Sequence, residues 1–371
     1  MRRRCWYSLL AAGVALVIVG ESRARADEVP AQYEPAIAKG LAWVAKAQHR
    51  DGHWEGTGGQ YNIAMTGLSG MALLMEGSTI NDGKYAHHVR KAVDWLMDRC
   101  QRNGLLGNTT VGERERYMYG HGFGLLFLAS VYGEEEDLDR RKRLEDVLVR
   151  AVQFSGKAQT SRGGWGYLAN GCNSEGDGID EGSVTITQVQ ALRAARNAGI
   201  TVPTSIIDRA IEYLKKSTMA SGGVIYSLGM GRYDQRPALT AAAIACGFSA
   251  GEYKSPLVKQ WLGYCQNSIP PLSATGGRIG HDEYTHYYYA QVLYMLGDDG
   301  YGKIFPGVPP EKRLTWSKYR KSTFDYLVSI QGADGSWNSS GRWGYIGPVY
   351  ATAMSLCILQ LDNGTLPIYQ R

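Results

Sequence analysis

The sequence predicts an all-α protein, an α/α toroid of six helical hairpins that forms one domain over residues 27–371. The main observation is a motif of glutamine, an Asp-Gly turn and tryptophan that occurs near both ends of the chain, at 48–54 and at 331–337. Strand signals are few and short, and residues 223–226 give the clearest one. A motif that recurs from one end of a chain to the other indicates a single repeat architecture.

Four weaker copies of the motif lie between these two, each where a helical pattern ends and a glycine-rich turn follows. They begin at Gln101, Gln159, Ser217 and Gln266. The second unit has leucine in place of tryptophan, the fourth lacks the glutamine, and the fifth carries a long insertion before its glycines at 276–277. Six units therefore fill the chain after its N-terminal leader.

The two helices of each unit differ in character. The leading helix has apolar residues at three- and four-residue spacing, as at Ile37, Leu41 and Val44, which is typical of an amphipathic helix. The trailing helices are rich in Ala, Gly, Leu and Tyr and nearly free of lysine, which predicts burial on most sides. They are expected at 61–74, 118–131, 184–195, 239–250, 284–296 and 349–361. An outer layer and a buried inner layer close best into a ring, because an open solenoid exposes its two end units.

These units resemble the QW repeats of the squalene cyclase and protein prenyltransferase β-subunit superfamily, over nearly all of the chain after the leader. The resemblance implies that the repeat glutamine ties helix ends together while the tryptophan stacks over it, since a side-chain amide can bridge carbonyl and N–H groups at helix termini. It also implies a central cavity, with any chemistry at the residues just before each inner helix. The repeat residues identify the fold and leave the reaction open.

Residues 1–26 have the pattern of a removable export signal. Arg2 to Arg4 precede an apolar run over 6–20, and a small-x-small cleavage site ends at Ala26. The apolar run is shorter than the roughly 20 residues that a bilayer span requires. We therefore expect a periplasmic or secreted protein, for which association with the envelope or a membrane surface is open.

The chain after the leader is close to neutral. The leader holds five of the 40 basic residues and one of the 35 acidic residues, which leaves 35 against 34. Without a basic stripe interleaved with aromatic residues, a nucleic-acid partner is not expected. Five cysteines follow the leader, and their scattered positions predict buried small hydrophobes, with one disulfide as the alternative. They are Cys100, Cys172, Cys246, Cys265 and Cys357.

One candidate acid comes from the resemblance to the cyclases. A cyclase that starts by protonation needs a carboxylic acid aimed into a dry cavity, and in that family an Asp-x-Asp-Asp-Thr-Ala stretch leads into an inner helix. The matching stretch here is Glu-Gly-Ser-Val-Thr-Ile at 181–186, so Glu181 replaces the first acid while Ser183 and Val184 replace the adjacent aspartates. The acidic segment 177–181 also fits a solvated turn or a helix N-cap.

The prenyltransferase branch implies a different site, in which aspartate, cysteine and histidine bind zinc. At the matching positions this chain has Ala238 and Thr240, and His286 lies one place late. We therefore expect neither a catalytic zinc ion nor another cofactor.

The fifth unit contains the densest group of polar candidates, at 281–289. On a helix, Asp282 and His286 share a face at i, i+4, so that with Glu283 they predict acid–base catalysis in the cavity. The alternative is that Asp282 caps the helix and His286 satisfies a buried carbonyl. The expected ligand-binding residues are Tyr119, His121, Arg232, Asp234, Tyr284 and Tyr288.

The aromatic composition indicates the class of ligand. The chain has 24 tyrosines against six phenylalanines, which suits a cavity whose walls present ring faces with hydroxyls at their rims. We expect an apolar small molecule or lipid of isoprenoid type. A polysaccharide hydrolase or lyase and a noncatalytic interaction scaffold are the alternatives. A deep apolar cavity favours the lipid, paired carboxylates in a cleft favour the glycan, and a filled centre favours the scaffold.

Overall fold

The structure is a computed structural model that describes residues 29–107, 109, 113, 115–169, 179–249, 251–272, 281–339 and 346–369. The expected export signal at 1–26, Cys172, most of the acidic segment before Asp180 and the glycines at 276–277 lie outside these residues.

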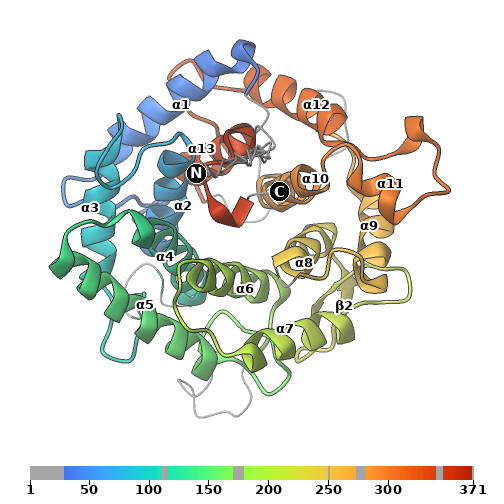
Figure 1. Ribbon diagram of the computed structural model, residues 1–371, viewed down its shortest axis with the longest axis horizontal. Coiled ribbons are helices and arrows are strands. Elements are labelled where there is room, and N and C mark those ends of the chain that lie inside the picture. The colour runs from blue at the N-terminus through green and yellow to red at the C-terminus, as the bar shows by residue number, and fades with distance from the viewer. Residues whose placement is uncertain are drawn as a thin grey trace, which may run out of the picture.

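Helices in two concentric rings make up the described chain (Figure 1). The outer ring consists of α1 (Glu34–Ala47), α3 (Ala86–Met97), α5 (Leu138–Ala158), α7 (Thr204–Lys216), α9 (Pro256–Ser268) and α12 (Trp316–Ser329). The inner ring consists of α2 (Asn62–Met75), α4 (Tyr117–Val131), α6 (Gly182–Asn197), α8 (Pro237–Ser249), α10 (Asp282–Leu296) and α13 (Pro348–Leu359). The expected α/α toroid of six hairpins is confirmed.

Several short helices and one β-hairpin connect or flank the helices of the two rings. The short helix α11 (Gly300–Ile304) lies between α10 and α12, and the 3-10 helices are η1 (Ala31–Tyr33), η2 (Tyr132–Glu134), η3 (Pro310–Lys312), η4 (Leu361–Asn363) and η5 (Pro367–Tyr369). The strand signal of the sequence corresponds to a small antiparallel hairpin of β1 (Ile225–Ser227) and β2 (Arg232–Gln235), which precedes α8.

Small residues allow the inner helices to pack closely. A Cβ atom at Gly67 would lie 2.5 Å from the carbonyl oxygen of Phe123, and one at Gly70 would lie 2.5 Å from the ring of Phe127. Any side chain at these two positions would prevent α2 from approaching α4 so closely. The glycines therefore suit the apolar α2 sequence to the crowded inner ring.

The repeat glutamine makes the same pair of hydrogen bonds in three units. Gln48 Nε2 donates to the carbonyls of Gly52 and His88 at 2.8 and 2.9 Å. Gln159 does the same to Gly163 and Ile206, at 2.8 and 2.9 Å. Gln331 does so to Gly335 and Ala36, at 2.9 and 2.8 Å. One amide thus satisfies a carbonyl of its own turn and another in the first turn of the next outer helix.

The repeat tryptophan stabilises the same turn through a buried hydrogen bond. The indole N–H groups of Trp54, Trp165 and Trp337 each donate to the carbonyl ten residues earlier, at 2.7, 2.8 and 2.8 Å. All three rings are fully buried between the outer and inner helices of their units. A buried indole needs such a partner, so these contacts explain the spacing of the motif.

Two side-chain contacts cross the junction between the last unit and the first. Gln331 Nε2 donates to the carbonyl of Ala36 at 2.8 Å, and Trp43 Nε1 donates to Asp334 Oδ2 at 3.0 Å. The latter contact has an exact counterpart between the first two units, where Trp95 Nε1 donates to Asp51 Oδ2 at 3.0 Å. The ring is therefore closed by the contacts that join neighbouring units elsewhere.

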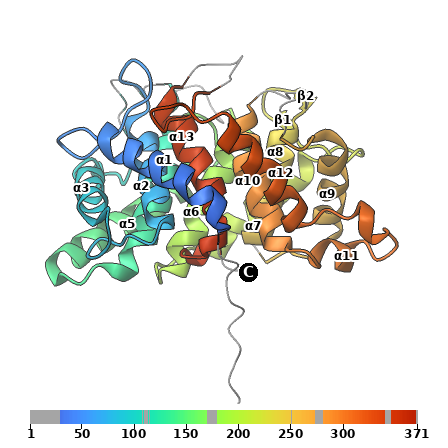
Figure 2. The same ribbon diagram turned by 90° about the horizontal axis from the view of Figure 1, so that it is seen from above.

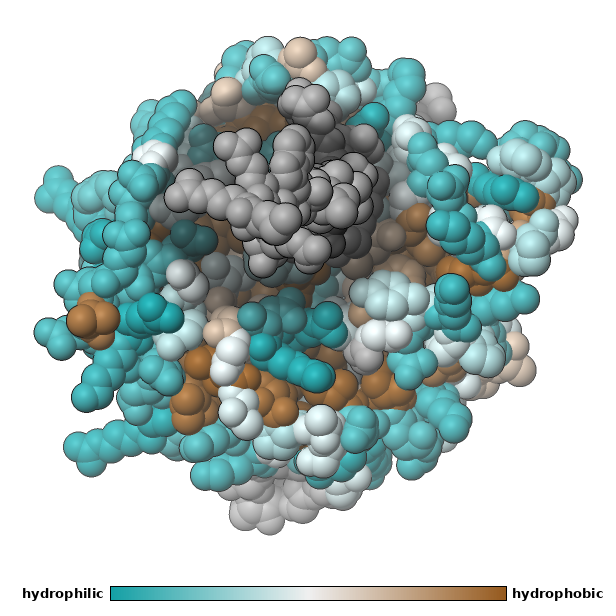
Figure 3. All heavy atoms as spheres, viewed as in Figure 1, coloured by the Kyte–Doolittle hydropathy of each residue, from teal (hydrophilic) through white to brown (hydrophobic). Residues whose placement is uncertain are grey.

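The two faces of the ring differ. The β-hairpin lies on one face, whereas η5 lies on the other, near the C-terminal end (Figure 2). Figure 3 shows this second face, with hydrophilic residues around the periphery and hydrophobic residues recessed between them. The hydroxyl of Tyr369 contacts that of Tyr287 at 3.2 Å, so the chain end packs against the inner ring.

The cysteines of the described residues are free thiols, and three of the four are buried. Burial alone raises the pKa of Cys246, Cys265 and Cys357, the last to about 12, which suits thiols that act as small hydrophobes. No helix among the described residues is both long and apolar enough to cross a membrane.

Candidate functional site in the central cavity

A cavity of about 300 Å³ lies where the inner helices begin. One part of its wall is apolar and comes from several inner helices, with Ala64, Met65, Leu68, Phe123, Leu239 and Tyr350 among its residues. The other part carries charges and hydroxyls, among them Arg116, Tyr119, Tyr167, Glu181, Tyr226, Arg236, Glu283 and Tyr284. Such a mixture of apolar surface and a few converging polar groups is typical of a small-molecule site.

Glu181 is the buried acid of this cavity, at 2% exposure. It is the N-cap residue of α6, and its carboxylate accepts the N–H of Val184 at 3.0 Å and the hydroxyl of Ser183. Burial raises its pKa, while the two hydrogen bonds and the charge of Arg116 act in the opposite direction. The cap explains why glutamate is placed there, and the raised pKa makes its carboxyl a weaker acid than an exposed one.

Ser183 joins two tyrosines to this acid. Its hydroxyl contacts that of Tyr119 on α4, and its carbonyl accepts the hydroxyl of Tyr284 on α10 at 3.0 Å. Burial raises the pKa of both tyrosines well above the ordinary value, so both keep their protons. Three inner helices therefore bring an acid and two O–H groups to one side of the cavity.

A second aromatic pair lies next to the first. The hydroxyls of Tyr167 and Tyr226 are 2.5 Å apart, and the guanidinium of Arg116 lies 4.8 Å from the ring centre of Tyr167. Arg232 covers the ring of Tyr226 at 4.8 Å. Cations over aromatic faces hold these rings in place at the mouth of the cavity.

Two residues of the wall have left-handed backbones, which non-glycine residues rarely adopt. They are Tyr61, with φ of 56°, and His281, with φ of 51°, and each is the N-cap residue of an inner helix. Such a conformation costs on the order of 1–3 kcal/mol and tends to occur at functional sites. Burial lowers the pKa of His281, and nearby Arg236 lowers it further, so its imidazole is neutral at pH 7.

The structure brings together four of the ten predicted site residues in the cavity wall: Tyr119, Glu181, Glu283 and Tyr284. Arg232 and Asp234 lie instead on exposed β2, where Asp234 pairs with Arg232 at 3.6 Å and with Arg236. Asp180 beside Glu181 is buried and structural, since its carboxylate accepts the N–H of Leu228 at 2.9 Å and so holds the β-hairpin.

The expected orientation of the acid-imidazole pair is corrected by the structure. His286 is turned toward the outer ring, where its Nδ1 atom lies 2.8 Å from the hydroxyl of Tyr319 on α12. Asp282 begins α10 and is buried at 7% exposure, and Tyr288 packs between inner helices with its hydroxyl 3.4 Å from Thr187. Asp282 and His286 share a helix face at i and i+4, and neither is among the residues that line the cavity.

His121 is also a core residue, which corrects its expected role in binding. Its Nδ1 accepts the N–H of Leu106 at 3.1 Å, and its Nε2 lies 2.9 Å from the hydroxyl of Ser155, which in turn donates to Gln188. Burial lowers the pKa of His121 to about 3. A neutral imidazole with both nitrogens bonded is a satisfied part of the core.

Sequence reasoning missed four residues that also line the cavity, namely Arg116, Tyr167, Tyr226 and Arg236. Their common signal is position, because each lies in a segment between an outer helix and the following inner helix. Composition gave no reason to prefer these arginines over others on the surface.

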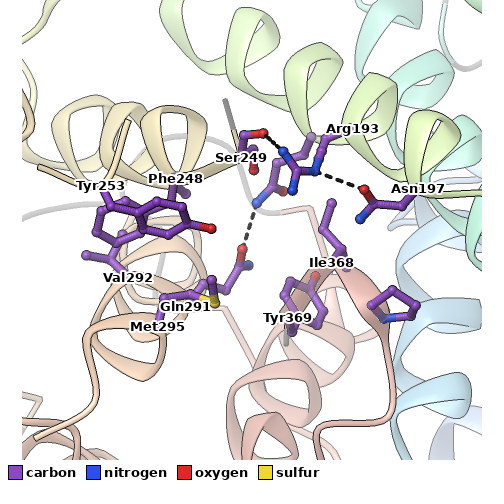
Figure 4. Close-up of a pocket in the computed structure, with 13 residues that line it drawn as sticks. Arg193, Asn197, Phe248, Ser249, Tyr253, Gln291, Val292, Met295, Ile368 and Tyr369 are labelled. Atoms are coloured by element: carbon purple, nitrogen blue, oxygen red, sulfur yellow. Dashed lines mark hydrogen bonds between the residues drawn. The ribbon is translucent and has the colours of Figure 1, made fainter. Parts of the chain in front are cut away.

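The opposite end of the ring holds a smaller cavity, of about 40 Å³. Figure 4 shows Arg193 between Ser249 and Asn197, with Tyr369 and Ile368 of the C-terminal end beside them. Arg193 donates to Asn197 at 3.0 Å. This space is large enough for a water molecule and too small for an isoprenoid or a sugar chain.

An open groove of about 510 Å³ also lies on the exterior, beside α1 and residues of the C-terminal segment. Its wall also contains acidic residues and Tyr85, but it does not lie where the inner helices begin, so the central cavity is the better candidate site.

The chain is similar to a curated protein, although no family model matches it. A probable squalene–hopene cyclase of Sinorhizobium fredii (strain NBRC 101917 / NGR234) is 25% identical over 287 residues, which cover 71% of this chain and 42% of the cyclase. The match therefore spans less than half of that protein.

Solved structures agree with this match at the level of fold. The type II terpene cyclase MstE from Scytonema superposes with a TM-score of 0.56 at 14% identity, over 90% of this chain and 99% of that one. The fold is a squalene cyclase-like toroid. The GH76A alpha-1,6-mannanase of Salegentibacter sp. HEL1_6 is also similar, with a TM-score of 0.60 at 10% identity over 90% of this chain and 99% of that one.

Proposed function

We propose that this toroid binds an apolar isoprenoid-like ligand in its central cavity and acts on it by acid–base chemistry. The observation that carries the proposal is the buried acid Glu181 beside a wall of aromatic and aliphatic side chains. Terpene cyclase MstE, which has this fold, is known in complex with geranylgeranyl dihydroxybenzoate, a substrate with a prenyl chain and a polar ring.

The apolar wall supplies the binding energy. Met65, Leu68 and Phe123 lie on α2 and α4, so a hydrocarbon chain placed between them loses its contact with water. Each Å² of apolar surface buried contributes roughly 25 cal/mol. The faces of Tyr119 and Tyr284 extend this wall and place their hydroxyls at its polar end.

The chemistry proposed for Glu181 differs from protonation of an alkene. A raised pKa makes the carboxyl a weaker acid. The two adjacent aspartates of the cyclase stretch, which would increase its acidity, are replaced here by Ser183 and Val184. When this carboxyl carries a proton, it can donate it to a hydroxyl or carbonyl oxygen at the polar end of a ligand. Glu283, which also lines the cavity, is the candidate base.

A cavity-filling variant tests the binding. Ala238 lines the cavity and is only half-buried, so Ala238→Trp fills the space with an indole while the helix core stays intact. We expect this variant to bind geranylgeraniol at least tenfold more weakly than the wild type, as measured by native mass spectrometry. Exposed Ala220→Trp is the matched control and should bind as wild type.

Equal binding by the wild-type protein and Ala238→Trp would overturn the central site. If Glu181→Gln binds geranylgeraniol normally but no longer converts a prenylated alcohol or phenol, the carboxyl acts in chemistry. Unchanged conversion by Glu181→Gln would remove it from the reaction.

A glycan hydrolase is the second candidate, and one observation favours it. Glu181 and Glu283 both line the cavity, and glycoside hydrolysis commonly uses two such carboxyl groups. The mannanase of the same fold has been solved with alpha-1,6-mannotriose bound in an inactive variant. Release of reducing sugar from α-1,6-mannan, lost in both Glu181→Gln and Glu283→Gln, would establish this function in place of the isoprenoid one.

Export is proposed from residues 1–26 alone, because they combine a basic start, an apolar run and a small-x-small site. We expect Asp27 as the first residue of the protein recovered from cells. N-terminal sequencing that finds Met1 would contradict cleavage.

A further inference from the structure

We propose a second ligand site, for a divalent cation of the zinc type, held by His49, His53 and Glu55. These residues lie in the turn of the first repeat, between α1 and α2. The proposal is independent of the ligand of the central cavity.

The three side chains already converge. His49 Nε2 lies 3.6 Å from Glu55 Oε1, and His53 Nε2 lies 3.7 Å from Glu55 Oε2. All three ligand atoms lie within 4.8 Å of one another. A tetrahedral zinc ion with bonds of about 2.0–2.1 Å holds its ligand atoms about 3.3 Å apart. The half-exposed side chains of His49 and Glu55 are free to make the small closing movement.

Asp51 supplies the outer partner that a metal-binding histidine usually has. Its Oδ1 atom lies 2.6 Å from His53 Nδ1, which places the proton of the imidazole on Nδ1 and leaves the Nε2 lone pair facing Glu55. Trp95 holds both residues, because its N–H donates to Asp51 Oδ2 at 3.0 Å and its ring stacks on His53 at 4.9 Å. The ligand is thus oriented before any metal binds.

Comparison between repeats shows that the turn itself does not need these side chains. In the first unit, His49 N donates to the carbonyl of His53 at 2.8 Å. The equivalent bond of the last unit joins Gly332 to Ser336, also at 2.8 Å. The same backbone therefore forms with glycine and serine, and the fold gives no reason for two histidines stacked 4.3 Å apart beside two carboxylates.

The donor set indicates the class of cation. Two imidazoles and one carboxylate match the ligands of zinc, whereas magnesium and calcium prefer oxygen ligands alone. Three protein ligands leave a fourth position for water or another molecule.

Zinc titration of the full-length protein, after chelator treatment, tests the site. We expect one zinc ion per chain, measured by competition with a chromogenic chelator and by elemental analysis, and little binding of magnesium. His53→Ala should weaken zinc binding at least a hundredfold. The exposed His87→Ala is the matched control and should bind zinc as wild type.

A second variant separates metal binding from folding. Asp51→Asn keeps all three ligands and removes the charge behind His53, so zinc affinity should fall about 10- to 100-fold. Equal zinc affinity of the wild type, His53→Ala and Glu55→Gln, or failure of the wild type to bind zinc at micromolar concentration, would overturn the proposal.

Discussion

Glu181 and His121 are both buried titratable residues at inner helices, but their surroundings give them different roles. Glu181 lies in a cavity wall, and its capping contacts leave the carboxyl beside open space. His121 has both imidazole nitrogens bonded inside the core. Whether a buried polar residue serves function or packing depends on its partners, and these become visible only in the tertiary structure.

His121 should make the stability of the protein depend on pH. Its folded pKa of about 3 lies below the ordinary 6.5, so the unfolded chain binds more protons between these values. The contribution to stability is full above pH 6.5 and is lost as pH falls toward 3, by about 1.4 kcal/mol per unit. We expect His121→Gln to reduce this loss, as measured by urea unfolding at pH 7, 5.5 and 4.5.

At pH 7 the same variant should be about 1–3 kcal/mol less stable than wild type, because Gln has to replace two buried hydrogen bonds. His87→Gln, on the surface, is the control and should keep the wild-type pH slope. A wild-type slope in His121→Gln as well would show that other groups cause the acid sensitivity.

At the scale of elements, sequence periodicity predicted where the helices lie, but it did not predict which side of α10 faces the cavity. The expected inner helix at 284–296 is observed as Asp282–Leu296, because its apolar and aromatic composition matches a helix buried on all sides. A helix with no polar face has no sequence signal for which side meets the cavity. Spacing therefore could not separate Glu283 and Tyr284, which line the cavity, from Asp282 and His286, which do not.

The repeat glutamine that joins the last unit to the first should contribute measurably to stability. Gln331→Ala leaves the carbonyls of Ala36 and Gly335 without this donor, so we expect a loss of about 1–3 kcal/mol in the free energy of unfolding. Urea unfolding measures the change. Gln153→Ala, on the exposed face of α5, is the control and should change stability by less than about 0.5 kcal/mol. Equal effects of the two variants would contradict a role in closure.

At the scale of the whole molecule, closure makes the first and last units neighbours. Tyr33 of η1 donates to Asp325 Oδ1 of α12 at 2.7 Å, across nearly 300 residues of sequence. Neither end of the ring then needs the polar cap that an open repeat array requires. The central cavity exists because six inner helices are held around it.

Removal of residues 310–371, the last hairpin, should therefore destabilise the whole protein and not one unit alone. The truncation exposes the apolar faces of α2 and α10 that α13 covers. We expect the full-length chain to unfold in a single cooperative step and the truncated chain to lose that step, as followed by circular dichroism during heating. A truncated protein with a sharp transition at the wild-type temperature would contradict closure as the source of stability.

The sequence by itself determined the repeat, the order of outer and inner helices and the closed ring, because each follows from local periodicity and from contacts repeated at fixed spacing. It also placed Glu181 and Tyr119 at helix starts, where the cavity lies. The tertiary structure alone decided which polar residues face that cavity, since Arg116, Tyr167 and Tyr226 come from three separate segments of the chain. Their convergence depends on how six units close around a common centre, and a sequence records no distance between residues far apart along the chain.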